Sequence, residues 1–77
     1  MIPTYSHQAE AFLDKQTARQ AARIKAAVMS LPLGDIKKLK GYQNMYRLRV
    51  GSFRIVFEKN GENYHVIKID NRGDVYK

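Results

Sequence analysis

A strict alternation of apolar and polar residues near the middle of the chain restricts its fold more than any other feature. In residues 46–50 apolar side chains alternate with Arg47 and Arg49, and after Gly51-Ser52 the same period of two resumes over residues 53–58. A period of two is typical of β-strands that bury one face. Because Gly51-Ser52 suits a two-residue type II′ turn, the segment predicts a β-hairpin.

A third strand is predicted after Asn60-Gly61, a dipeptide that strongly favours hairpin turns. This strand should cover about Asn63 to Ile69. Its apolar residues occupy both odd and even positions and would therefore point to both faces of the strand. This pattern is typical of a central strand that is covered on both faces. The lysine-rich stretch from Asp35 to Asn44 contains turn residues and predicts a loop.

Two helices are predicted before the hairpin. Ser6 can cap a helix that ends near Lys15. Thr17 and Gln20 have the spacing of a capping box, and apolar residues then recur every three or four positions to about Ser30. With a short apolar start over residues 2–5, the predicted order is β-α-α-β-β-β. We therefore expect one α+β domain over residues 1–77, with both helices on one face of a small antiparallel sheet and the other face free.

The overall composition restricts the possible functions. A formal charge of +7 on 77 residues favours nucleic acid or an acidic protein as the partner. The absence of cysteine excludes disulfides, cysteine-zinc sites and thiol nucleophiles. His7 and His65 stand alone, so we expect neither a metal site nor a cofactor. Without a leader or a long apolar run, we expect a soluble, cytoplasmic protein with no membrane partner.

Basic residues concentrate in and before the hairpin. If Gly51-Ser52 is a two-residue turn, Arg49 lies opposite Arg54, and Arg47 shares their face. Like charges in opposed positions cost roughly 0.2 to 1 kcal/mol per pair, so a polyanionic ligand explains them better than packing does. Between Asp35 and Glu58 no acidic residue occurs, which predicts a positive field that is not neutralised locally. The predicted RNA-binding residues are Lys37, Lys38, Lys40, Arg47, Arg49 and Arg54. A solvated face whose arginines only keep the sheet soluble is the alternative.

Aromatic residues and histidines accompany this cluster. Tyr46 and Phe53 fall on the Leu48 face and are expected in the core, whereas Tyr42 and Tyr76 remain open to stacking on unpaired bases. His65 can reach the free face, although a lone strand histidine is more often structural. His7 is expected to be exposed in the first helical turn.

The runs over residues 39–41 and 46–57, together with the ending from Asn71 to Lys77, resemble the signature of RelE-type toxins. These toxins belong to the RelE/ParE toxin–antitoxin superfamily, and the two helices match that family's layout. The resemblance implies a ribosome-dependent endoribonuclease that inhibits translation by cleaving messenger RNA through its 2′-hydroxyl, without a metal, and that binds a cognate antitoxin. By the same resemblance, the catalytic residues are Arg47, Arg49, Arg54, Arg72 and Tyr76.

This sequence departs from the family pattern in two places. Lysines often occupy the positions of Arg47 and Arg49, and Asn71 stands where relatives often carry histidine. Because arginine is a poor proton shuttle at neutral pH, Tyr76 is the first candidate for proton transfer. Two other functions fit the fold: a ParE-like DNA gyrase inhibitor, whose branch generally lacks the arginine set, and a non-catalytic RNA-binding module.

Overall fold

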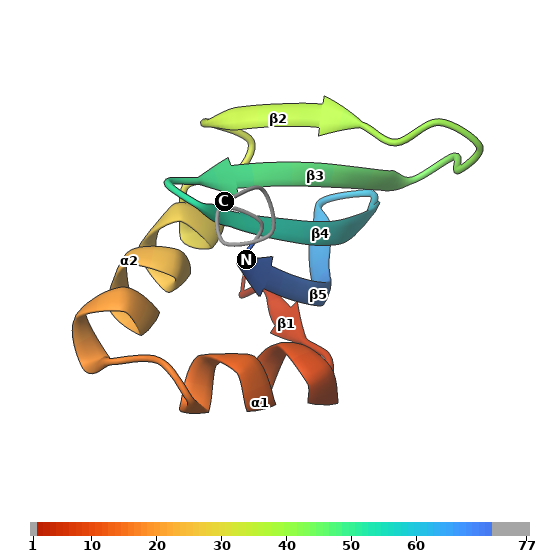
Figure 1. Cartoon of the computed structure of the whole chain (residues 1–77). Helices are drawn as coiled ribbons and strands as arrows, with labels where there is room; N and C mark the ends of the chain where they lie inside the picture. Colours follow the sequence, from red (N-terminus) through yellow and green to blue (C-terminus); the bar gives the residue numbers. More distant parts are fainter. Residues whose placement is uncertain (1, 72–77) are drawn as a thin grey trace.

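The computed structural model describes residues 2–71, so the predictions for Arg72 and Tyr76 lie outside the described residues. The five strands form one sheet in the order β1-β5-β4-β3-β2, and the helices pack against one of its faces (Figure 1). This arrangement confirms the predicted α+β fold. The elements along the chain are β1 (Thr4–Tyr5), α1 (His7–Asp14), α2 (Ala18–Met29), β2 (Asp35–Lys38), β3 (Met45–Val50), β4 (Phe53–Asn60) and β5 (Asn63–Asn71).

Both helices begin at the predicted capping residues. The Ser6 hydroxyl accepts a hydrogen bond from the backbone N–H of Ala9 at 3.1 Å, and the Thr17 hydroxyl accepts one from Gln20 at 3.2 Å. Each hydroxyl satisfies a backbone donor that has no partner inside the helix. The predicted ends, Lys15 and Ser30, are the residues that cap the two helices at their C-termini.

The central hairpin has the predicted register. Arg49 lies opposite Arg54, and the flanking pairs match as well. Gly51 has φ 59° and no non-glycine residue among the described ones has positive φ, as the predicted type II′ turn requires. A side chain at Gly51 would also meet Arg23, because an ideal Cβ there lies 2.9 Å from the Arg23 Nη2. The positive φ is therefore what favours glycine at this turn, since the flexible end of the Arg23 side chain can move aside.

The sheet contains one strand that we predicted as a loop and one that pairs in an unpredicted direction. Asp35–Lys38 is an edge strand, antiparallel to β3. Its one apolar residue, Ile36, gives no alternation to detect, and charged residues are common on edge strands. β1 runs parallel to β5, with Thr4 opposite His65, so the sheet is mixed and not antiparallel throughout.

The strand β5 is covered on one face, not on both as its sequence predicted. Opposite β4, the register shifts between Val56 and Phe57, so that Ile67 has no partner there. This bulge of one extra residue shifts the alternation of side chains between the two faces of the sheet. Val66 and Ile69, which are three positions apart, are consequently both buried against the helices. The bulge explains the apolar residues at both odd and even positions, and the helices leave the opposite face uncovered.

The core lies between the helices and the sheet, and Phe57 is the largest of its most deeply buried side chains. The Phe57 ring stacks on Tyr46 and meets Tyr64 edge to face, each with a centroid distance of 5.6 Å. Phe53 is also buried, so the prediction that Tyr46 and Phe53 belong to the core is confirmed. The buried residues are Ala9, Leu13, Ile24, Val28, Leu31, Leu48, Phe53, Ile55, Phe57, Tyr64, Val66 and Ile69.

Candidate functional site

The sheet face that the helices leave uncovered carries two adjacent rows of mostly charged side chains. Opposed residues in antiparallel strands point to the same face, so the register defines both rows. We call this surface the arginine face; it consists of Asp35, Arg49, Arg54 and Asp70 in one row and Lys37, Arg47, Val56 and Lys68 in the next. The predicted grouping of the three arginines on one face is confirmed.

The three predicted RNA-binding lysines do not share one surface. Lys37 lies opposite Arg47 and joins the arginine face. Lys38 lies opposite Tyr46, so the alternation of β2 places it on the helix side of the sheet and not on the arginine face. Lys40 follows β2 in the connection to β3 and is exposed. In a strand, neighbouring side chains point to opposite faces of the sheet. Because we predicted this segment as a loop, we had no reason to place Lys37 and Lys38 on different faces.

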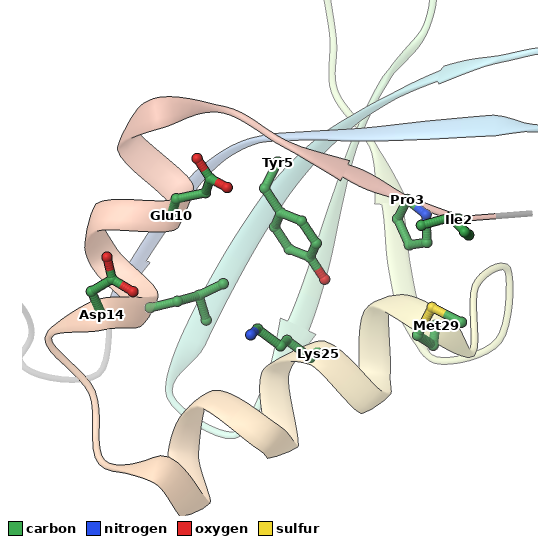
Figure 2. Close-up of a pocket in the computed structure, with 8 residues that line it drawn as sticks. Ile2, Pro3, Tyr5, Glu10, Asp14, Lys25 and Met29 are labelled. Carbon is green, nitrogen blue, oxygen red and sulfur yellow. The ribbon is translucent and has the colours of Figure 1, made fainter.

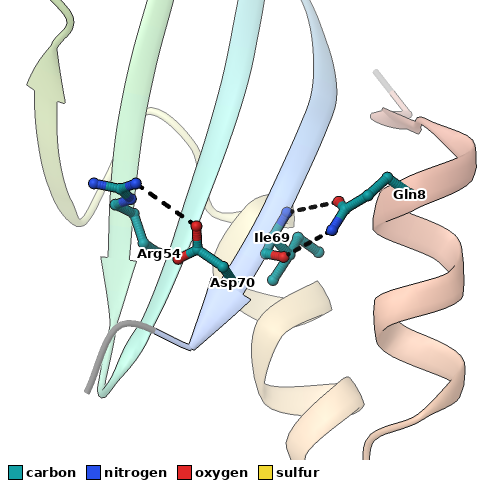
Figure 3. A network of polar contacts seen from close by, with 4 residues as sticks. All are labelled: Gln8, Arg54, Ile69 and Asp70. Carbon is teal, nitrogen blue, oxygen red and sulfur yellow. Dashed lines mark hydrogen bonds and ion pairs between the residues drawn. The ribbon is translucent and has the colours of Figure 1, made fainter. Parts of the chain in front are cut away.

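Two carboxylates neutralise part of the arginine face, contrary to the prediction of an unneutralised field. The Arg47 Nη1 lies 3.6 Å from the Asp35 Oδ1, and the Arg54 Nη2 lies 3.6 Å from the Asp70 Oδ2 (Figure 3). The prediction failed because it considered one continuous stretch of sequence, whereas β2 and β5 bring these acids in from outside it. Five cationic side chains still face two carboxylates, so the surface remains positive.

Several polar atoms on this face lack hydrogen-bond partners. A separation of 3.6 Å allows charge attraction but exceeds hydrogen-bond length. The Arg47 Nη1 and the Arg54 Nε are buried and make no hydrogen bond within the described chain, and the same holds for the Asp70 Oδ1. An unsatisfied buried donor costs about 1 to 3 kcal/mol, so a ligand that supplies acceptors is favoured here. Phosphate oxygens match guanidinium donors especially well.

The two histidines lie where the sequence predicted. His7 is exposed at the start of α1. His65 lies opposite Glu58, one row beyond Val56 on the uncovered face, where its Nδ1 is 2.7 Å from the Thr4 Oγ1 in a hydrogen bond. Among residues 2–71, no three histidine or carboxylate side chains gather in a group able to hold a metal ion.

Sequence reasoning missed Arg23 at the end of the sheet. Its guanidinium lies over Gly51, and together with Arg49 it lines a hollow of about 480 Å³. Arg23 therefore extends the positive charge around the β3–β4 turn toward α2. Helical periodicity identifies only the apolar side of α2. The sequence therefore contained no signal that Arg23 lies close to Gly51.

A separate cavity of about 470 Å³ opens on the helix side, between β1, α1 and α2 (Figure 2). Burial raises the pKa of the Tyr5 hydroxyl above its usual value. No residue of the arginine face lines this cavity, so the two are distinct surfaces. The cavity is lined by Ile2, Pro3, Tyr5, Glu10, Leu13, Asp14, Lys25 and Met29.

No helix within residues 2–71 is both long and apolar enough to cross a membrane.

Comparison with known proteins identifies the family. The family model described as the ParE toxin of the type II toxin–antitoxin system parDE matches residues 4–76. The chain belongs to this toxin family. The predicted membership of the RelE/ParE superfamily is therefore confirmed.

Relatives of this ParE-family toxin carry RelE names. Toxin RelE3 of Methanocaldococcus jannaschii is 48% identical over 42 residues, which are 54% of this chain and 48% of RelE3, so the match spans about half of that curated relative. A chain in the RelB-RelE antitoxin–toxin complex from Methanococcus jannaschii has a TM-score of 0.76 and 30% identity, covering 96% of this chain and 95% of that one. A chain in the archaeal RelE-RelB complex from Pyrococcus horikoshii OT3 has a TM-score of 0.70 at 20% identity, with 95% and 98% covered, and shows the fold alone.

Proposed function

We propose that this toxin is a ribosome-dependent endoribonuclease that cleaves messenger RNA without a metal and so inhibits translation. The arginine face is the observation that carries this proposal. In-line attack by a ribose 2′-oxygen develops negative charge on the phosphoryl oxygens, and preorganised guanidiniums stabilise that charge. Arg47 and Arg54 each have a buried donor without a partner among residues 2–71, which suits an incoming phosphate.

The proposed roles follow from position on the arginine face and from the family resemblance. Arg54 holds the scissile phosphate, while Arg47 and Arg49 bind it from the neighbouring strand. Arg72 and Tyr76, beyond the described residues, complete the site, with Arg72 contributing charge and Tyr76 either exchanging a proton or stacking on a base. The exposed Lys37 and Lys40 bind flanking phosphates.

We also propose a cognate antitoxin as the protein partner. Two similar structures are toxin–antitoxin complexes of the RelB-RelE kind. The expected site of action is the cytoplasm, where both ribosome and antitoxin are available. An antitoxin that covers the arginine face would prevent RNA from reaching it.

Inhibition of DNA gyrase is the second candidate function. The description of the matching family model as ParE favours it. Against it stand the three arginines on the uncovered sheet face, which the ParE branch generally lacks. The RelE names of the relatives also favour RNA cleavage.

One experiment separates these candidates. We would add the purified protein to a translating extract and map message ends by primer extension, with a gyrase supercoiling assay in parallel. The nuclease proposal expects new message ends before translation stops and unchanged supercoiling. Intact message together with inhibited supercoiling would establish the gyrase function instead.

The affinity for single-stranded RNA should fall steeply with salt. Each neutralised phosphate contributes a slope of about −0.7 in log K against log salt concentration. Arg49→Ala should therefore reduce the slope by about 0.7, whereas Lys38→Ala, on the helix side of the sheet, should leave it nearly unchanged. Fluorescence anisotropy with a 2′-deoxy oligonucleotide measures both variants, and a salt-independent affinity of the parent would exclude phosphate binding by this face.

A further inference from the structure

We propose that Asp70 is the proton acceptor of this nuclease, taking the proton of the attacking 2′-hydroxyl while Arg54 holds the phosphate. The inference rests on the proposed ribonuclease function. The sequence placed no carboxylate among the arginines, so it offered Tyr76 as the first candidate for proton transfer. The register of β4 and β5 changes that conclusion, because it places Asp70 directly opposite Arg54.

The position of Asp70 suits proton transfer at a phosphate held by Arg54. Its side chain is 23% exposed and its Oδ2 lies 3.6 Å from the Arg54 Nη2 (Figure 3). A phosphate bound to the same guanidinium would therefore lie next to this carboxylate. Asp35, the other carboxylate of the arginine face, has a side chain that is 61% exposed, so solvent competes with substrate for its oxygens.

The Asp70 carboxylate also retains unused hydrogen-bonding capacity. Its Oδ1 is buried and has no hydrogen-bond partner within the described chain, and its Oδ2 is beyond hydrogen-bond length from Arg54. An ionised carboxylate accepts several hydrogen bonds, so its lone pairs remain available to a substrate hydroxyl. Because the terminal torsion of aspartate is soft, either oxygen can turn toward the hydroxyl.

Other titratable groups on the uncovered face are less suitable. Glu58 lies about 13 Å along the strand from Arg54, at 3.3 Å per residue, and its Oε1 accepts a hydrogen bond from Asn60. His65 lies opposite Glu58 and is hydrogen-bonded to Thr4. Arginines remain protonated at neutral pH and cannot accept the proton.

The backbone beside Asp70 is held by a side chain of α1. The Gln8 Nε2 donates to the Ile69 carbonyl at 3.2 Å, and the Gln8 Oε1 accepts from the Ile69 N–H at 3.1 Å (Figure 3). These two hydrogen bonds satisfy the N–H and the carbonyl of Ile69, which lie on the edge of β5 that faces β1. β1 itself pairs with β5 only at His65 and Val66. It therefore holds the end of β5 in place, with Asp70 directed to the opposite face.

The proposed step conserves atoms and charge. The 2′-hydroxyl proton passes to an Asp70 oxygen as the 2′-oxygen forms a bond to phosphorus. The bond between phosphorus and the 5′-oxygen breaks, and the 5′-oxygen takes a proton from water. The products are a 2′,3′-cyclic phosphate and a 5′-hydroxyl end, and Asp70 then returns its proton to solvent.

Asp70→Asn tests this role because it removes the basic oxygen and retains the shape of the side chain. The cleavage rate at saturating protein should fall about 10² to 10⁴-fold, as for other general bases. Affinity for an uncleavable 2′-deoxy RNA should stay equal or increase, because a negative charge beside the phosphate is removed. Formate or acetate should restore part of the activity of Asp70→Ala. Asp14→Asn makes the same charge change on α1 and should cleave like the parent.

The possible outcomes separate the two proposals. If the parent does not cleave ribosome-bound message, the nuclease function is wrong, and the role of Asp70 is wrong with it. If the parent cleaves and Asp70→Asn cleaves equally fast, only the role of Asp70 is wrong. If Asp70→Asn loses affinity for the 2′-deoxy RNA as much as it loses rate, and small carboxylates restore nothing, Asp70 merely positions Arg54. Circular dichroism of each variant verifies that the fold is retained.

Discussion

Arg54→Ala should lower the rate of RNA cleavage about 10² to 10³-fold, the usual loss when one preorganised donor to a developing negative charge is removed. The fold should survive the change. Arg54 lies on the uncovered face with a side chain that is 34% exposed, and its ion pair with Asp70 contributes on the order of 1 kcal/mol to stability. Single-turnover cleavage of message on programmed ribosomes measures the rate.

Two further variants make the Arg54 result specific. Arg54→Lys keeps the charge but loses the planar fork, so it should cleave at a rate between those of Arg54→Ala and the parent. Leu48→Ala truncates a side chain that is 1% exposed and should lower the free energy of unfolding by about 2 to 5 kcal/mol. A comparable loss of stability in Arg54→Ala would mean that its side chain supports the core, and the decrease in cleavage would then reflect unfolding.

The central part of the fold was predictable because its signals are local. Alternation over residues 46–58 identifies two strands, and the glycine at position 51 fixes the turn between them, which sets Arg49 opposite Arg54. The caps at Ser6 and Thr17 are equally local, because each side chain bonds to a backbone group three residues ahead. The arginines of the candidate site lie on this hairpin, so local signals in the amino-acid sequence were sufficient to locate them.

The missed features depend on pairing between distant segments. Nothing within Asp35–Lys38 indicates that this charged segment pairs with β3, yet that pairing brings Asp35 to Arg47. The apolar pattern of β5 does not reveal the bulge opposite Val56, because the alternation of inward and outward side chains changes at that point in the strand. For these reasons the sequence located the arginines of the site but not their two carboxylates.

Phe57→Ala should destabilise the protein by about 3 to 5 kcal/mol, the largest stability loss that we expect from a single truncation in this core. Phe57 is 2% exposed and contacts both Tyr46 and Tyr64, and each aromatic pair contributes about 0.5 to 1.5 kcal/mol beyond its buried area. Urea unfolding followed by circular dichroism measures the loss. Tyr42→Ala is the matched control, because Tyr42 is 60% exposed and its removal should change stability by less than about 0.5 kcal/mol.

The comparison of Phe57→Ala with Arg54→Ala also tests how one strand serves two purposes. Phe57 and Arg54 both lie on β4, but their side chains point to opposite faces of the sheet. Phe57→Ala should lose cleavage only to the extent that it unfolds, so cooling should restore both its fold and its cleavage. Arg54→Ala should remain folded and inactive under the same conditions. Equal stability of Phe57→Ala and the parent would contradict the burial of this ring and the inward facing of β4.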